Sequence, residues 1–304
     1  MIHMQKILFP TDFSDTTSAA LGHALMMADR FRAELIMLHA APAHEKPQDL
    51  RFPEIYPAAD ELQEALEEQL TQIFGTEPAH KLRLQRVVQQ NNNPVQEICA
   101  FAESRQIDLI IMGTHGRHGL SHLFAGSVAE DVVRKANCPV MTVRAGKKAA
   151  EVSPYFDILV PVDFSLHSEK ALRYGRTLAL LFDATLHMLH VLDQPILPSH
   201  YGIGEDSLIQ LDPEVSHRSR EEMVRWLEQW GTERVKYQIH FREGRAYHEI
   251  VDFAAKQECD LLVMGTHGLS GLEHFLLGGT TEKVMRHVSC PVLALKLKER
   301  DFVG

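Results

Sequence analysis

The chain has 304 residues, which at ~150 residues per domain predicts two domains. Its net charge of −10 disfavours nucleic acid as a partner, because clustered Lys and Arg hold phosphate backbones, and no basic patch for a membrane surface stands out. No apolar run reaches the ~20 residues of a membrane span and MIHMQKILFP lacks a signal-peptide core, so we expect a cytoplasmic protein.

The first half of the sequence alternates short apolar runs with amphipathic segments. The apolar runs are too brief for helices and predict strands at 7–9, 34–39, 82–88, 108–112 and 140–143. Helices are expected from Ser14 to about residue 31, over 58–74 after a proline-rich excursion, and over 94–104 and 127–136. Strands buried on both faces and separated by helices indicate a parallel sheet with right-handed crossovers.

Three sequence blocks of the first half return in the second. KILFPTDFS returns as DILVPVDFS, DLIIMGTHG as DLLVMGTHG, and NCPVMTV as SCPVLAL. Asp12 to Asp163 spans 151 residues and Gly113 to Gly265 spans 152, so the blocks keep a nearly constant offset. Such an offset indicates duplication of a whole domain rather than a short solenoid unit.

The duplication predicts an α/β protein with two tandem doubly wound parallel-sheet domains. The boundaries are 1–146 for the first domain, 147–156 for a polar linker and 157–304 for the second domain. The second domain is expected to repeat the element order of the first, with its excursion at 193–216.

Ligands of an open parallel sheet bind beyond the carboxyl ends of its strands, where the strand order reverses. Three segments of the first copy are expected at this edge: Pro10-Thr11-Asp12, the strand end at Ala40, and the loop GTHGRHGLSHLFAGS from Gly113 to Ser127. The sequence therefore predicts a ligand site built from these segments.

The loop from Gly113 to Ser127 has the features of a phosphate site. Gly113 and Gly116 can adopt positive φ and allow a ligand to approach the backbone. Gly126 and Ser127 open the next helix, whose first amides are unpaired and lie at the positive end of its dipole. The spacing is neither the Walker pattern nor GxGxxG, so we predict an anion site at a helix N-terminus.

With the loop and the aspartate both duplicated, the chain resembles the universal stress proteins in their tandem form. The ATP-binding subgroup of that family carries G-x2-G-x9-G-[ST], which Gly113, Gly116, Gly126 and Ser127 match. The resemblance covers essentially the whole chain. It implies Rossmann-like domains of the adenine nucleotide alpha hydrolase-like type. It also implies ATP as ligand, with ADP or AMP as alternatives and Mg²⁺ as the companion of ATP.

The second copy departs from the family motif at its last position. Gly265, Gly268 and Gly278 match, but Gly279 stands where Ser or Thr is expected, and Thr280 follows it. This substitution removes a hydroxyl contact from the second site while leaving the backbone amides in place.

The resemblance also assigns residues outside the loops. Asp12 and Asp163 are implied to lie near the adenine and ribose, and Ala40 and Val191 to line the adenine pocket. Met112 and Met264 are implied to pack in the same region. The full expected nucleotide-binding set is Pro10, Thr11, Asp12, Ala40, Met112, Gly113, His115, Gly116, Arg117, Gly126, Ser127, Val128, Pro161, Val162, Asp163, Val191, Met264, Gly265, His267, Gly268, Gly278, Gly279 and Thr280.

The two predicted sites differ in charge. Arg117 follows the second glycine of the first loop, where the second loop has Leu269. Because a cation beside phosphates adds a charge-assisted contact, we expect the first site to bind nucleotide more tightly. Titration of the separate halves would test this ranking.

Neither metal chemistry nor catalysis is expected. The spacing of His115, His118 and His122 could suggest zinc, but no cysteine lies nearby to complete a ligand set. Asp12 and Asp163 each lack a second carboxylate at a matching position, so a hydrogen bond to the ligand is favoured over acid–base or metal chemistry. No catalytic residue is assigned.

The favoured function is regulatory: ATP acts as a conformational ligand that biases contacts with a protein partner. A slow ATPase or phosphotransfer enzyme is the alternative, although only Ser127 and Arg117 could stabilise transition-state charge. A third alternative is a scaffold whose second site, altered at Gly279, takes a lipid-like or adenine-only ligand.

The last strands, in CPVMTVR and CPVLALK, resemble the family's usual dimer edge. We expect them to pair within the chain as a pseudo-dimer, since exposed strand edges invite pairing. Association of two chains into a homodimer is left open by the sequence.

Overall fold

The computed structural model describes residues 3–13, 15–41, 82–114, 127–144, 154–192, 213–230, 235–268 and 277–303. These residues form two compact units, the first made of Met1–Pro154 with Ser289–Gly304 and the second of Tyr155–Val288. The helix predicted over 58–74 and the central part of the first glycine loop, 115–126, lie outside the described residues.

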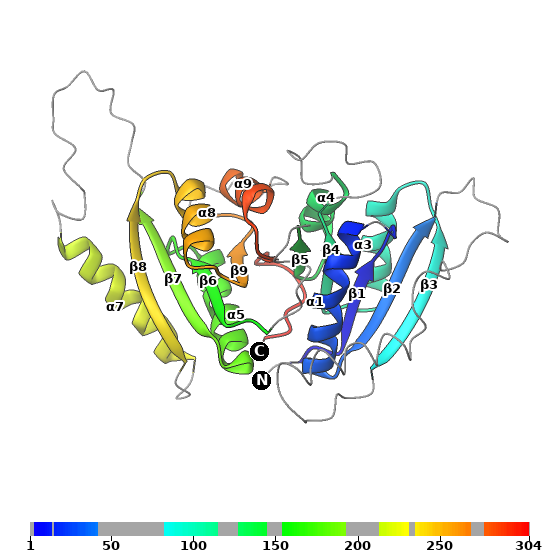
Figure 1. Cartoon of the computed structure of the whole chain (residues 1–304), viewed down its shortest axis with the longest axis horizontal. Helices are drawn as coiled ribbons and strands as arrows, with labels where there is room; N and C mark the ends of the chain where they lie inside the picture. Colours follow the sequence, from blue (N-terminus) through cyan, green and yellow to red (C-terminus); the bar gives the residue numbers. More distant parts are fainter. Residues whose placement is uncertain are drawn as a thin grey trace, which may run out of the picture. The chain divides into compact units, whose positions relative to one another are not determined.

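The first unit is a mostly parallel sheet with helices between its strands (Figure 1). Its strands lie in the order β3-β2-β1-β4-β5-β10, and only β10 runs antiparallel, against β5. The elements are β1 (Lys6–Pro10), α1 (Asp15–Phe31), β2 (Glu34–Ala41), β3 (Arg83–Gln90), α3 (Pro94–Ser104), β4 (Leu109–Gly113), α4 (Ser127–Lys135), β5 (Val140–Val143) and β10 (Val292–Leu295).

The second unit repeats the parallel order as β9-β6-β7-β8. Its elements are β6 (Asp157–Pro161), α5 (Leu166–Phe182), β7 (Thr185–Leu192), α7 (Pro213–Gln229), β8 (Lys236–Glu243), α8 (Ala246–Lys256), β9 (Leu261–Gly265) and α9 (Gly279–His287). The predicted α/β class is thus confirmed. Helix α7 begins at Pro213, inside the predicted excursion, because proline is well tolerated at the first position of a helix.

The central strands are short because they are buried on both faces. Ile7, Leu8 and Phe9 of β1 have no exposed surface. The edge strand β3, with the sequence RLQRVVQQ, is half exposed and correspondingly polar. This contrast is the usual one between the centre and the edge of a parallel sheet.

An aspartate ties the two central strands together at the amino end of each sheet. Asp108 Oδ2 accepts from the backbone N–H groups of Gln5 (2.8 Å) and Lys6 (3.0 Å). Asp260 Oδ2 accepts from Phe156 (2.8 Å) and Asp157 (3.1 Å) in the same way. The repeated aspartate that begins DLIIMG and DLLVMG is therefore structural, and it satisfies backbone donors at the start of the neighbouring central strand.

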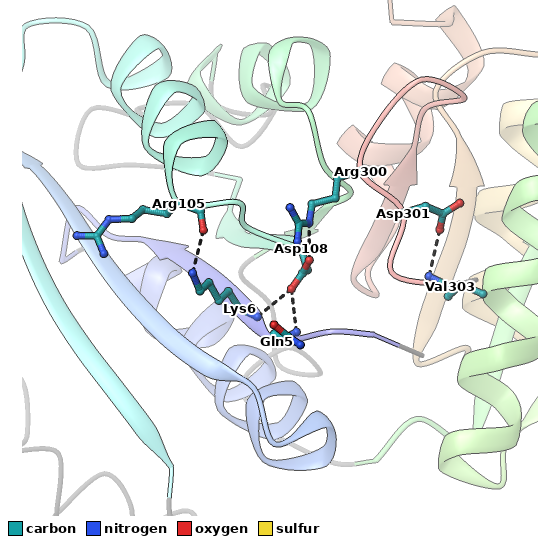
Figure 2. Close-up of polar contacts among 7 residues, drawn as sticks. All are labelled: Gln5, Lys6, Arg105, Asp108, Arg300, Asp301 and Val303. Atoms are coloured by element: carbon teal, nitrogen blue, oxygen red, sulfur yellow. Dashed lines mark hydrogen bonds and ion pairs between the residues drawn. The ribbon is translucent and has the colours of Figure 1, made fainter. Parts of the chain in front are cut away.

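The C-terminal segment completes the first unit. Strand β10 pairs with β5, with Leu293 opposite Met141, so the strands expected to pair with each other do so. Arg300 Nε lies 2.6 Å from Asp108 Oδ1, as Figure 2 shows, and Phe302 is buried with its ring edge-on to Phe31. The last residues of the second sequence copy, Ser289–Gly304, are thus part of the first compact unit.

Lys296 adds a cation at the C-terminal end of α4. Its Nζ donates to the carbonyls of Val133 (3.0 Å) and Arg134 (3.3 Å), and also to that of Ala136. A helix ends with unpaired carbonyls and partial negative charge, so this contact stabilises α4. None of the helices in the described ranges combines the length and apolar character needed to cross a bilayer.

Candidate functional site

The site of each unit lies where the strand order reverses. In the second unit β6 lies between β7 and β9, so the switch point, where open α/β sheets bind their ligands, lies beyond the carboxyl ends of β6 and β9. Pro161 ends β6, followed by Val162 and Asp163, while Gly265 ends β9 and opens the glycine loop. The topology therefore brings the predicted aspartate and glycine segments to one edge.

The turn that carries the aspartate has the same strained backbone in both units. Phe13, after Asp12, and Phe164, after Asp163, both have φ of 62°. Non-glycine residues are uncommon in this left-handed region, and they persist where the surrounding structure holds them. The repetition of this conformation marks the turn as a functional candidate.

Hydrogen bonds hold the second turn. Asp163 Oδ1 accepts from the backbone N–H (3.1 Å) and the hydroxyl (2.6 Å) of Ser165. Ser165 is in turn the N-cap of α5, accepting from Ser168 N at 3.2 Å. The carboxylate orientation is thus fixed by the start of the following helix.

A histidine at the end of the second strand supports each turn; from the sequence these two histidines are expected as partly buried pocket or packing residues, and the structure adds their hydrogen-bond acceptors. His39 Nδ1 lies 2.8 Å from the carbonyl oxygen of Thr11, and His190 Nδ1 lies 2.7 Å from that of Val162. A carbonyl can only accept, so Nδ1 carries the hydrogen in each ring. The rings also lie 4.6 Å from Phe13 and 5.0 Å from Phe164, the two left-handed residues.

The glycine loop of the second unit lies against the aspartate turn. A Cβ on Gly268 would be 2.4 Å from Asp163 Oδ2, and a Cβ on Gly265 would be 2.6 Å from the Cβ of His167 in α5. A Cβ on Gly278 would be 2.9 Å from the Thr266 carbonyl oxygen, to which Gly278 N donates. All three motif glycines are therefore needed for close packing.

Gly279, the position that departs from the motif, is different. No heavy atom of the described residues lies within 4 Å of a Cβ built there. It is the first residue of α9, with Gly278 as N-cap. The next residue, Thr280, is exposed, whereas Thr281 is buried and its hydroxyl donates to the Gly265 carbonyl at 2.9 Å. Sequence reasoning missed Thr281 because it lies outside the motif.

The remaining predicted residues of the second site lie on β7, at the end of β9 and in the start of the loop. Val191 lies on β7 and is half-buried, and Met264 is buried next to the loop. His267 Nδ1 is 3.0 Å from Thr266 Oγ1, and its ring is 5.4 Å from that of His167. His167, on the first turn of α5, is a further neighbour of the loop that the motif did not indicate.

The first site is described in part. Pro10 ends β1, Thr11 and Met112 are buried, and Ala40 is half-buried at the end of β2. Gly113 ends β4, and α4 begins at Ser127 with Val128 in its first turn, as predicted. The predicted residues outside the described part are His115, Gly116, Arg117 and Gly126. In the described ranges, no cluster of three or more His, Cys, Asp or Glu could hold a metal ion.

Fold and site define the second unit as a doubly wound α/β module with an aspartate turn and a glycine loop at the strand switch, and the described part of the first unit has the same strand order and aspartate turn. The universal stress protein family model matches residues 3–144 and again residues 154–296. The chain therefore belongs to the universal stress protein family, with two copies of the family domain in one polypeptide.

Individual relatives agree with this assignment. Universal stress protein MJ0531 of Methanocaldococcus jannaschii is 34% identical over 148 residues, covering 48% of this chain and 85% of the relative. The universal stress protein E homolog of Haemophilus influenzae is 26% identical over 228 residues, covering 73% of this chain and 72% of the relative. A universal stress protein from Archaeoglobus fulgidus has the same fold, with a TM-score of 0.62, 22% identity and 97% of both chains covered.

Proposed function

We propose that each unit binds an adenine nucleotide, and that the protein acts as a regulatory stress-response module rather than as an enzyme. The observation that carries this proposal is the contact of Gly268 with Asp163, where a Cβ would be 2.4 Å from the carboxylate. This contact brings a carboxylate that can accept hydrogen bonds from ribose hydroxyls next to a loop whose amides can donate to phosphates.

The second unit would hold phosphates through backbone amides. Helix α9 begins at Gly279, and its first N–H groups face the loop end with the positive end of the helix dipole. A small side chain at position 279 is compatible with this contact, since a Cβ built there would meet no neighbouring atom within 4 Å. Ala40 and Val191, half-buried at the ends of β2 and β7, would give the base an apolar surface.

Nucleotide titration with two glycine variants tests the proposal. We expect the full chain to bind two molecules of ATP with Mg²⁺, and Gly268→Ala to bind one, because the new Cβ displaces Asp163 or the loop. Gly279→Ala is the matched control: its Cβ meets no described atom within 4 Å, so it should still bind two.

Isothermal titration with ATP, ADP and AMP provides the stoichiometry and the nucleotide preference. Hydrogen exchange of the β6 and β9 peptides checks that Gly268→Ala is folded. No binding by the wild-type chain, or unchanged stoichiometry in a folded Gly268→Ala chain, would refute the proposal.

A further inference from the structure

Three polar side chains from neighbouring strands form a chain in the second unit. Asp157 begins β6, His187 is the third residue of β7 and His240 is the fifth residue of β8. His187 Nε2 lies 2.8 Å from Asp157 Oδ1, and His187 Nδ1 lies 3.2 Å from His240 Nε2. His187 is buried, whereas Asp157 and His240 are half-buried. Both ring nitrogens of a buried histidine thus face a polar partner.

The two rings are nearly parallel and approach each other through one nitrogen of each. Their centroids are 5.3 Å apart and their planes differ by 27°, while the facing nitrogens are only 3.2 Å apart. A carboxylate only accepts, so His187 Nε2 donates to Asp157. With both rings neutral, His187 Nδ1 is therefore an acceptor, and His240 Nε2 carries the hydrogen of the contact between the rings.

This arrangement limits how many protons the pair can bind. With one added proton, either ring becomes an imidazolium that donates to the other, and the Asp157 carboxylate balances the charge. A second added proton leaves an N–H on both facing nitrogens, which have no acceptor between them. Two N–H groups at this distance repel each other, so the contact between the two rings must break and one of the side-chain links between β7 and β8 is lost.

The surroundings add further resistance to a second charge. The Phe253 ring of α8 lies 4.6 Å from His240 and 6.1 Å from His187. Arg242 on β8 lies over Phe253, and Arg220 on α7 lies over Phe241. Burial lowers the pKa of His240, and the charges of His187, Arg242 and Arg220 lower it further.

The first unit lacks this chain. The corresponding positions are Lys6 at the start of β1, Ile36 as the third residue of β2 and Val87 as the fifth residue of β3. Two of these three side chains cannot bind a proton. The contrast makes the first unit an internal reference for the second.

We propose that Asp157, His187 and His240 form a proton-binding switch that holds the edge strand β8 to β7 near neutral pH and releases it on acidification. One proton is accepted without loss of the contact between the rings, and a second separates them. The switch belongs to the second unit and does not depend on nucleotide binding.

Hydrogen exchange of the full chain tests the switch. Protection of the β8 peptide, corrected for intrinsic exchange, is compared at pH about 7.5 and about 4.5. The lower pH lies well below the ordinary histidine pKa of ~6.5, because the pKa of His240 is lowered. We expect the protection factor of β8 to fall about tenfold more than the protection factor of β3. The reason is that losing an interaction worth one pKa unit changes the local opening equilibrium about tenfold. EDTA in all samples excludes adventitious metal.

The matched variant combines His187→Ile with His240→Val, the residues that the first unit carries at these positions. In this variant, the pH dependence of β8 protection should be no larger than the pH dependence of β3 protection. Other acid-sensitive groups act in wild type and variant alike, so the difference between the two isolates the pair. Equal pH dependence of β8 in both proteins would overturn the proposal.

A second measurement covers failure of the double variant to fold. In His240→Val, which keeps the bond of His187 to Asp157, β8 protection is compared at the same two pH values as in the wild-type chain. Without the second ring, the fall in β8 protection on acidification should shrink to that of β3. An undiminished fall in this single variant would overturn the switch.

Discussion

His39 and His190 show how a single residue can support a site without belonging to its motif. Each donates from Nδ1 to the carbonyl that precedes the aspartate, and each packs on the phenylalanine in the left-handed conformation. Their position at the end of the second strand was visible in the sequence. The acceptor of each ring was not, because it lies 28 residues away along the chain.

His23 makes the stability of the first unit depend on pH. This histidine of α1 is buried, and burial lowers its pKa to about 4. The unfolded chain, with an ordinary pKa of ~6.5, therefore takes up the proton first as the pH falls. The neutral ring contributes its full stability above pH ~6.5. As the pH falls towards the folded-state pKa of about 4, the free energy of unfolding decreases progressively, by about 3 kcal/mol in total.

We expect His23→Leu to flatten the pH dependence of the free energy of unfolding of the first unit between pH about 6.5 and about 4. Urea unfolding at several pH values, followed by hydrogen exchange of the β1 peptide, measures this. His217→Gln is the control, since the His217 side chain is 72% exposed. A His23→Leu chain with the same pH slope as the wild type would contradict the assignment.

At the scale of elements, the C-terminal segment is the least local feature of the fold. Strand β10 belongs by sequence to the second copy, yet it pairs with β5, and Arg300 lies against Asp108, which is buried. Asp108 already accepts from two strand N–H groups, so Arg300 supplies the positive charge for its other oxygen. The tail thus stabilises the amino end of the first sheet.

We expect Arg300→Ala to lower the free energy of unfolding of the first unit by about 1–2 kcal/mol. This is the contribution of a hydrogen bond to a charged group, reduced because Arg300 is exposed to solvent. Lys298→Ala, an exposed cation on the same segment, should leave it unchanged. Hydrogen exchange of β1 and β4 peptides in increasing urea distinguishes the two variants. Equal protection of these peptides in both would show that the ion pair contributes nothing.

At the scale of the whole molecule, the compact units do not coincide with the two sequence copies. A cut after Pro154 would remove residues 289–304 from the first unit, including its strand β10. Separate halves are therefore poor samples for comparing the two sites. The division into 1–146 and 157–304 stays a prediction about the unit of duplication.

The ranking of the two sites is better tested in the full chain. Asp163→Ala leaves the first site intact and Asp12→Ala leaves the second. We expect the Asp163→Ala chain to bind ATP about tenfold more tightly, since Arg117 can add a charge-assisted contact that Leu269 cannot. Isothermal titration at fixed Mg²⁺ measures both. Tighter binding by the Asp12→Ala chain would reverse the ranking.

Much of the fold followed from local patterns. Three patterns could be recognised from neighbouring residues: the apolar runs, the repeated PTDFS and PVDFS turns, and the spacing of the glycines. They predicted which segments form strands and placed the candidate site at the carboxyl ends of those strands. The duplication then fixed the α/β class twice over. Motif residues such as Gly268 and Asp163 could be assigned to one edge from these patterns alone.

Contacts between distant segments were decided only by the tertiary structure. Strand register placed His187 beside Asp157 and His240, and the packing of the loop brought Gly268 within Cβ contact of Asp163. Pairing of β10 with β5 sent the last residues of the chain to the first unit. The physical reason is the same in each case: local pattern specifies which element forms, but partners far apart in sequence are chosen by register and burial, which depend on the whole folded unit.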